Sequence, residues 1–126
     1  MVTGRRFENL GAVVRAGSFE ILAGVSPESG GANEGPEPHR LLEAALASCT
    51  IITVQMYANR KQWPLKGVNA TVDIVKEGPE GTVIKRQLSF DGDLSDEQRQ
   101  RLYQIAEKCP IHRILSGKIE VQSSLV

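Results

Sequence analysis

The sequence has little cysteine, no excess of charge of either sign and no internal repeat. Two cysteines among 126 residues are too few for a scaffold held together by disulfides, so each thiol serves either chemistry or packing. The 15 basic side chains balance the 15 acidic ones, which argues against nucleic acid and against an acidic membrane surface as partners. These shortages exclude whole classes of protein before any motif is considered.

Long hydrophobic runs are also scarce. The longest, at residues 41–54, contains Glu43 and falls short of the roughly 20 residues that a transmembrane helix needs. The N-terminal stretch MVTGRRFENL carries basic residues but lacks the apolar segment of a secretory signal. We therefore expect a cytoplasmic protein with no membrane partner, folded as a single domain over residues 1–126.

Two segments alternate in the manner of antiparallel hairpins. Residues 11–22 alternate on either side of Ala-Gly-Ser at 16–18, and residues 68–90 do so on either side of Gly-Pro-Glu-Gly at 78–81. The stretch at 24–38 between the first hairpin and the next element is crowded with glycine and proline, which predicts a long loop.

The segment HRLLEAALASCTIITVQMYANRKQW predicts a long central helix that Pro64 and Gly67 end, because alanine and leucine favour helix and apolar residues occupy every side between Leu41 and Val54. Ser95 and Gln98 match a capping box, and a second helix should follow with one apolar face that ends at Cys109. Pro110 breaks that helix or starts a short new one that runs through Leu115 and ends at Gly117, and residues 118–122 alternate as a closing strand. The predicted order is ββ-α-ββ-α-β, an α+β fold.

Cys49 lies in the middle of the central helix among small residues. On spacing alone a packing role is favoured, because buried cysteine commonly fills small spaces. A thiol attacks only as thiolate, and apolar burial raises its pKa unless a cation stands nearby. A reactive Cys49 therefore requires an arginine.

Cys109, sixty residues further along the chain, is also predicted to point inward. Packing is again the simpler interpretation, although two inward thiols could meet in space, as two-step thiol redox chemistry requires. The fragment Cys109-Pro110-Ile111-His112 offers only two metal ligands, and His39 and Cys49 have no matching spacing. We expect no metal site.

Two further polar residues have alternative roles. His39 follows Pro38 at the start of the helix, where it could cap the helix, face solvent or touch a substrate; an exposed capping role is favoured. Arg86 interrupts the inward pattern of the second hairpin, so it lies either at a sheet edge or in a site. We favour the edge.

The run GPEPHRLLEAALASCTIITVQMYANRKQWPL closely resembles the central helix of OsmC/Ohr proteins, in which a Gly-x-x-Pro entry precedes Leu-Leu-x-Ala-Ala-Leu-x-x-Cys. The segment AEKCPIHRIL is similar to the second cysteine segment of that family. The two motifs stand in the family's order, and the resemblance covers nearly the whole chain. It implies an OsmC-like α+β domain whose long buried central helix is packed by antiparallel sheets in an intertwined homodimer.

The resemblance also implies a chemistry. In that family the first cysteine attacks a peroxide and the second resolves it, so Cys49 is expected to reduce a small organic hydroperoxide to an alcohol. Attack leaves a sulfenic acid on Cys49, Cys109 condenses with it to a disulfide, and an external dithiol reduces that bond. No cofactor is expected.

The best-studied branch of the family holds the thiolate with an arginine from the N-terminal hairpin and a glutamate before the cysteine. Here the resemblance implies Arg15, with Arg6 as the alternative, while His39 stands where that branch has glutamate and Glu43 lies six residues before Cys49. His39 and Glu43 are accordingly expected on the substrate side. The alternative function is a non-catalytic dimer that binds a small apolar ligand and whose cysteines are structural.

Overall fold

The computed structural model describes residues 1–126, which form two compact units, residues 1–42 and 43–126. Each unit is described by itself. The prediction of a single domain stays a prediction.

The first unit is built on an antiparallel sheet of order β1-β2-β3, with strands Thr3–Phe7, Gly11–Ala16 and Phe19–Ala23. The hairpin predicted at 11–22 is confirmed: Ala16 pairs with Phe19 across a two-residue turn. Gly17 has a φ of 62° there, a conformation that glycine adopts without strain. Strand β1 was not predicted, because its charged sequence TGRRF shows no apolar alternation.

The predicted loop between the first sheet and the central helix is confirmed. It contains only a short 3₁₀ helix, η1, Pro27–Ser29. The loop leads into α1, which runs from Pro38 to Lys61 and begins with the proline at a position where the missing N–H is harmless.

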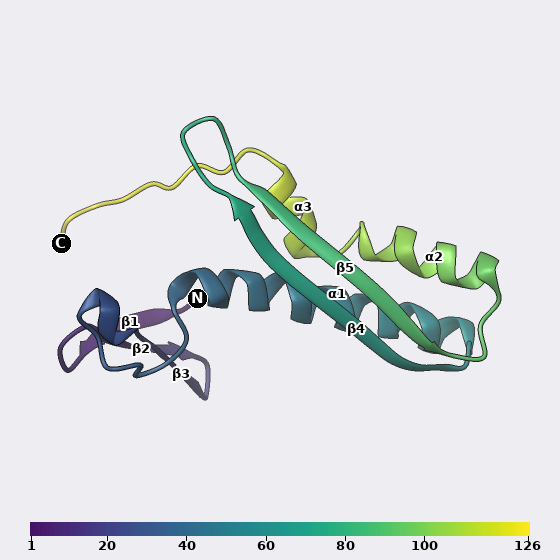
Figure 1. The fold of residues 1–126 in the computed structure, drawn as a ribbon, viewed down its shortest axis with the longest axis horizontal. Helices are drawn as coiled ribbons and strands as arrows, with labels where there is room; N and C mark the ends of the chain where they lie inside the picture. The colour runs from purple at the N-terminus through teal and green to yellow at the C-terminus, as the bar shows by residue number, and fades with distance from the viewer. The chain divides into compact units, whose positions relative to one another are not determined.

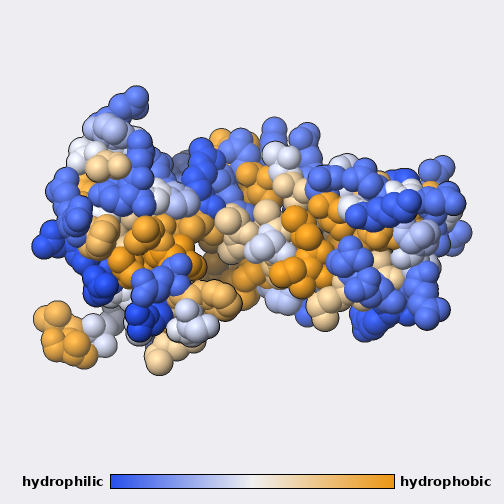
Figure 2. All heavy atoms as spheres, turned by 90° about the horizontal axis from the view of Figure 1, so that it is seen from below, coloured by the Kyte–Doolittle hydropathy of each residue, from blue (hydrophilic) through white to orange (hydrophobic).

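The predicted central helix is confirmed as α1, and its burial follows one stripe. The buried residues recur every three or four positions: Glu43, Leu46, Thr50, Val54 and Ala58. On another face Ile52 and Met56 are 57% and 61% exposed. Figure 2 shows hydrophobic side chains gathered over the middle of the region that α1 occupies. One chain therefore covers this helix on one side only.

The expectation that no segment is long enough to cross a bilayer is wrong on length. Helix α1 runs for 24 residues and is long and apolar enough to span a membrane by length and composition alone. The core helix of a soluble protein passes the same test. The buried stripe of α1 packs into the core of the second unit, as such a helix does.

The second unit adds a long antiparallel hairpin, β4 Leu65–Lys76 and β5 Val83–Gly92. This hairpin and its turn at 78–81 are confirmed, with the Gly81 amide donating to the Gly78 carbonyl at 3.1 Å. Alternate residues of β5 are more buried, namely Ile84, Arg86, Leu88 and Phe90. Figure 1 shows the hairpin crossing α1 as a twisted ribbon with α2, Asp96–Ala106, beside it.

The core lies between α1, the hairpin and α2. Its buried cluster consists of Val54, Ala58, Leu65, Leu102 and Ala106. Aromatic residues close its edges, with Tyr57, Trp63 and Phe90 packed against it. Since each fully buried large aliphatic side chain contributes roughly 1.5–3 kcal/mol, this cluster fixes α2 against α1.

Two predictions about the C-terminal third are corrected. The second helix does not reach Cys109 but ends at Ala106, since a residue before proline avoids helical dihedral angles. Cys109, with φ −62° and ψ 139°, instead caps the N-terminus of α3, Pro110–Ser116. The closing strand predicted at 118–122 is absent, because no neighbouring strand pairs with it. The capping box of Ser95 and Gln98 is confirmed.

Candidate functional site

The two cysteines meet beside α1. Cys49 is partly exposed on the helix, whereas Cys109, the N-cap of α3, is completely buried, and both are free thiols. The Cys109 thiol lies near enough to Cys49 to lower the pKa of the Cys49 thiol, and the His112 amide donates to the Cys109 sulfur at 3.3 Å. Folding therefore brings together two sulfurs that are sixty residues apart in the sequence, one of them accessible and the other enclosed.

Thr50 connects the elements around this thiol pair. Its hydroxyl donates to the Leu46 carbonyl at 2.7 Å, a common bond for threonine within a helix. The same oxygen accepts from Arg86 Nη1 at 3.0 Å and lies 3.8 Å from Cys109 Sγ. With its proton committed to Leu46, this buried hydroxyl orients α1, β5 and the Cys109 sulfur relative to one another.

Arg86 is the cation of the site. Its side chain is 8% exposed, and Nη2 pairs with Glu107 Oε1 at 3.4 Å. The other oxygen of Glu107 lies 3.3 Å from His112 Nε2. A buried guanidinium requires a counter-ion and acceptors, and Arg86 has both. Arg86 lies on an edge strand of the two-stranded sheet, as favoured, but its guanidinium is buried in the site.

The surroundings of Cys49 favour its thiolate. Burial raises the pKa of the Cys49 thiol, but hydrogen bonds from the Ile111 backbone, the Cys109 thiol and the Thr53 hydroxyl lower it. The positive charge of Arg86 acts in the same direction, and the pKa of Cys49 lies below its ordinary value. A larger fraction of Cys49 is thus nucleophilic at neutral pH than for an ordinary thiol.

The remaining predicted site residues are Glu43, His39 and Arg15. Glu43 is 6% exposed and accepts from the Ile74 amide at 2.9 Å, where the pairing of β4 with β5 shifts register. His39 is exposed in the first turn of α1. Arg15 pairs with Glu20 at 2.7 Å, and their side chains are 64% and 49% exposed. The structure places Cys49 near Cys109 and near the positive charge of Arg86, and the roles assigned to the two cysteines stay predictions.

Thr50 and Glu107 escaped sequence analysis, and Arg86 was considered for a site but assigned to a sheet edge. Because side chains alternate along β5, Arg86 lies on the same face as Leu88. This alternation was the available signal that Arg86 points inward. Thr50 and Glu107 carry no such signal, because their roles depend on which elements pack together.

No cluster of three or more potential metal ligands occurs in the chain. The thiols and their neighbours form a site whose chemistry resides in sulfur. An accessible thiolate next to a buried thiol can be oxidised and then close a disulfide.

The family model described as OsmC-like protein matches residues 31–124. Among curated proteins, none matches the sequence. Solved structures match over most of both chains. An OsmC-like protein from Mycoplasma pneumoniae has a TM-score of 0.76 at 19% identity, covering 93% of this chain and 86% of its own.

Two further solved structures are described as organic hydroperoxide resistance proteins. OsmC from Legionella pneumophila has a TM-score of 0.66 at 20% identity, covering 93% of this chain and 88% of its own. OhrB of Bacillus subtilis has a TM-score of 0.60 at 23% identity, covering 90% and 87%. At these identities the likeness shows the fold, and with the match over residues 31–124 the chain belongs to the OsmC-like protein family.

Proposed function

We propose that this protein is a thiol peroxidase that reduces organic hydroperoxides to alcohols, with Cys49 as the nucleophile and Cys109 as the resolving thiol. The observation that carries the proposal is a partly exposed free Cys49 of lowered pKa beside a buried free Cys109. Solved structures of the same fold described as organic hydroperoxide resistance proteins support the substrate class.

The reaction balances with the two thiols and one external reductant. The Cys49 thiolate attacks the terminal oxygen of the hydroperoxide and the O–O bond breaks. The alkoxide takes a proton from solvent and leaves as the alcohol, and Cys49 becomes a sulfenic acid. Cys109 then attacks the Cys49 sulfur and water leaves. An external dithiol reduces the resulting disulfide and restores both thiols.

Arg86 supplies positive charge at the moment of attack. Its position is fixed before substrate arrives by Thr50 and Glu107, so no reorganisation is needed when charge develops on the peroxide. We keep Arg15 as a proposed catalytic residue that favours the Cys49 thiolate and His39 as a proposed substrate contact. The hydrogen bond from the Ile74 amide to Glu43 supports a mainly structural role for that carboxylate.

The apolar side of α1 supports the proposed homodimer. Ile52 lies one turn beyond Cys49, and Met56 one further turn along, both more than half exposed. A second chain packed there would cover these side chains and enclose Cys49 in apolar surroundings suited to an organic hydroperoxide. A cytoplasmic location belongs to the same proposal, since it supplies the reducing dithiols.

Mass spectrometry tests the mechanism directly. After one equivalent of cumene hydroperoxide, the peptides that contain Cys49 and Cys109 should be linked with the loss of two hydrogens. In the Cys109→Ser variant the Cys49 sulfenic acid should persist and react with dimedone. The wild-type protein could instead remain fully reduced, with added free thiols consumed no faster than in buffer without protein. That result would support the non-catalytic ligand-binding dimer.

A further inference from the structure

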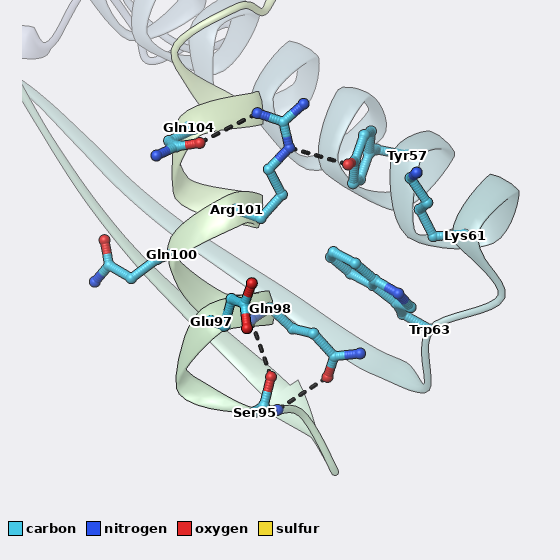
Figure 3. A pocket seen from close by; sticks show the side chains of 9 residues that line it. All are labelled: Tyr57, Lys61, Trp63, Ser95, Glu97, Gln98, Gln100, Arg101 and Gln104. Carbon is cyan, nitrogen blue, oxygen red and sulfur yellow. Dashed lines mark hydrogen bonds between the residues drawn. The ribbon is translucent and has the colours of Figure 1, made fainter.

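A cavity of about 570 Å³ opens between the C-terminal end of α1 and α2. Figure 3 shows Lys61 and Tyr57 approaching it from α1, Arg101 from α2, and the Trp63 ring lying between these residues and the start of α2. The lining is polar apart from the two aromatic rings: Tyr57, Lys61, Trp63, Ser95, Glu97, Gln98, Gln100, Arg101 and Gln104. None of the thiol-site residues contributes to it.

Three cations surround one ring of this pocket. The charged groups of Arg101, Lys61 and Arg60 lie 5.5, 5.7 and 5.9 Å from the centroid of Tyr57. Arg101 Nε also donates to the Tyr57 hydroxyl at 3.0 Å. That hydrogen bond lowers the pKa of Tyr57; burial acts against it, and the charges of the three cations act with it. The pocket therefore carries a concentrated positive field.

Arg60, Lys61 and Arg101 form no ion pair within the chain. None of the three cations has a carboxylate within ion-pair distance, and although Glu97 lines the pocket one turn before Arg101, it pairs with neither Arg101 nor Lys61. Arg101 Nη1 donates to Gln104 at 3.2 Å, and Nη2 has no protein partner. Donors are thus available to a ligand.

The aromatic rings limit what the ligand can be. Trp63 meets Tyr57 edge to face, with centroids 5.5 Å apart and an angle of 74°, and both rings line the pocket. The volume is in the usual range for small organic ligands and exceeds that of an inorganic anion. The start of α2 is not the anion site, because Ser95 and Gln98 occupy its amides and two acidic residues follow.

We propose that this pocket binds a small planar organic anion, an aromatic carboxylate, with its ring against Trp63 and its carboxylate at Arg101 and Lys61. Guanidinium and ammonium donors recognise carboxylates strongly, and a ring on tryptophan adds stacking. The glutamines on α2, at 98 and 104, offer amides to further polar substituents of the ligand. This site is independent of the thiol chemistry.

Trp63 is the only tryptophan of the chain, so intrinsic tryptophan fluorescence of the full-length protein reports on this pocket alone. Titration with benzoate should change the emission saturably, whereas benzamide, which has the same ring without the charge, should bind at least about tenfold more weakly. Raising the salt concentration should weaken benzoate binding, since the contact is ionic. A titration with sulfate distinguishes general anion binding from recognition of the ring.

Two variants and a matched control separate this site from the rest of the surface. Arg101→Gln and Lys61→Gln should each weaken benzoate binding about tenfold, the loss of one charge-assisted hydrogen bond. Arg113→Gln changes the net charge equally on an exposed part of α3 and should leave it unchanged. Lys61 is exposed and donates no hydrogen bond to the protein, so its variant tests the proposal even where Arg101→Gln disturbs folding.

Several results would overturn the proposal. These are no saturable change up to about 10 mM benzoate, equal binding of benzoate and benzamide, or equal affinity in wild type and Lys61→Gln. Sulfate that binds as tightly as benzoate would reduce the site to a general anion patch and would also contradict it. None of these outcomes bears on turnover of hydroperoxide by Cys49.

Discussion

Two arginines reach α1 from neighbouring elements, and each donates to a hydroxyl of that helix at 3.0 Å. Arg86 of β5 binds the Thr50 hydroxyl, and Arg101 of α2 binds the Tyr57 hydroxyl. Arg86 is nearly buried and has Glu107 as its counter-ion, whereas Arg101 is partly exposed and has none. A buried guanidinium therefore needs a carboxylate counter-ion, whereas a partly exposed one does not. The first arginine positions a thiol pair, and the second leaves its charge open to a ligand.

The largest expected effect is on hydroperoxide turnover and is expected at Cys49, whose pKa the charge of Arg86 lowers. Cys49→Ser should lower hydroperoxide turnover at least about a thousandfold, because removal of a nucleophile removes the covalent route. Turnover is followed with cumene hydroperoxide and a dihydrolipoyl or dithiothreitol donor. Cys109→Ser is the matched control and should retain the first attack on peroxide. Equal turnover in wild type and Cys49→Ser would contradict the proposed function.

The next largest effect is expected on the free energy of unfolding when the buried guanidinium of Arg86 is removed. Arg86→Met strands Glu107 and Thr50 and should cost about 2 kcal/mol of unfolding free energy, at the lower end for a broken ion pair because the Glu107 side chain is 43% exposed. Urea unfolding measures the loss. Arg113→Met, an exposed basic residue of α3, should change stability by less than about 0.5 kcal/mol. Equal losses in the two variants would remove the contrast between buried and exposed arginines.

The same variant should shift the pH dependence of Cys49. Since the pKa of Cys49 is lowered, its alkylation should rise with pH and level off at a lower pH than for an ordinary thiol. Arg86→Met removes one lowering contribution, so the midpoint should move to higher pH. Iodoacetamide kinetics with Cys109→Ser as background checks the direction. An unchanged midpoint would mean that Arg86 exerts no electrostatic effect on Cys49.

The capping box of the helix that carries Arg101 gives a smaller effect. Ser95→Ala removes the acceptor of the Gln98 amide and should cost about 1 kcal/mol of unfolding free energy. Ser48→Ala is a suitable control, because Ser48 is exposed and bonds only to the Ala45 carbonyl within its own helix. Thermal unfolding compares the two. Equal melting temperatures would show that the box contributes nothing measurable.

The smallest effect is expected at the exposed arginine. Arg101→Met should change stability by less than about 1 kcal/mol, since the guanidinium is solvated and has no ion-pair partner. The pKa of Tyr57, lowered chiefly by its hydrogen bond with Arg101, should rise toward its ordinary value. Ultraviolet titration of the phenolate measures the shift. A destabilisation as large as that of Arg86→Met would show that the two arginines are equivalent.

Local patterns predicted the parts of the fold that local physics decides. The length and position of α1, the turn at 78–81 and the capping box at Ser95 each follow from a few neighbouring residues. The pairing of Cys49 with Cys109 needed the family resemblance, because no spacing rule joins residues sixty positions apart.

The rest depends on packing that the sequence does not state. Arg86 was assigned to a sheet edge because charge on an inward face is costly, and only the structure shows the Glu107 carboxylate that removes this cost. The strand expected at 118–122 has the right alternation but no partner strand within the chain. The second helix was predicted to reach Cys109. The effect of Pro110 on the preceding residue would have been enough to predict that Cys109 lies outside that helix.

Glu107 stands at the C-cap of α2 and contacts both Arg86 and His112. One residue inserted into α2 would rotate that carboxylate by about 100° around the helix axis and advance it by about 1.5 Å, away from Arg86 of β5. The length of α2 therefore matters for this ion pair as well as for the packing of the hydrophobic core. Insertions here should be tolerated far less well than in the turn at 78–81.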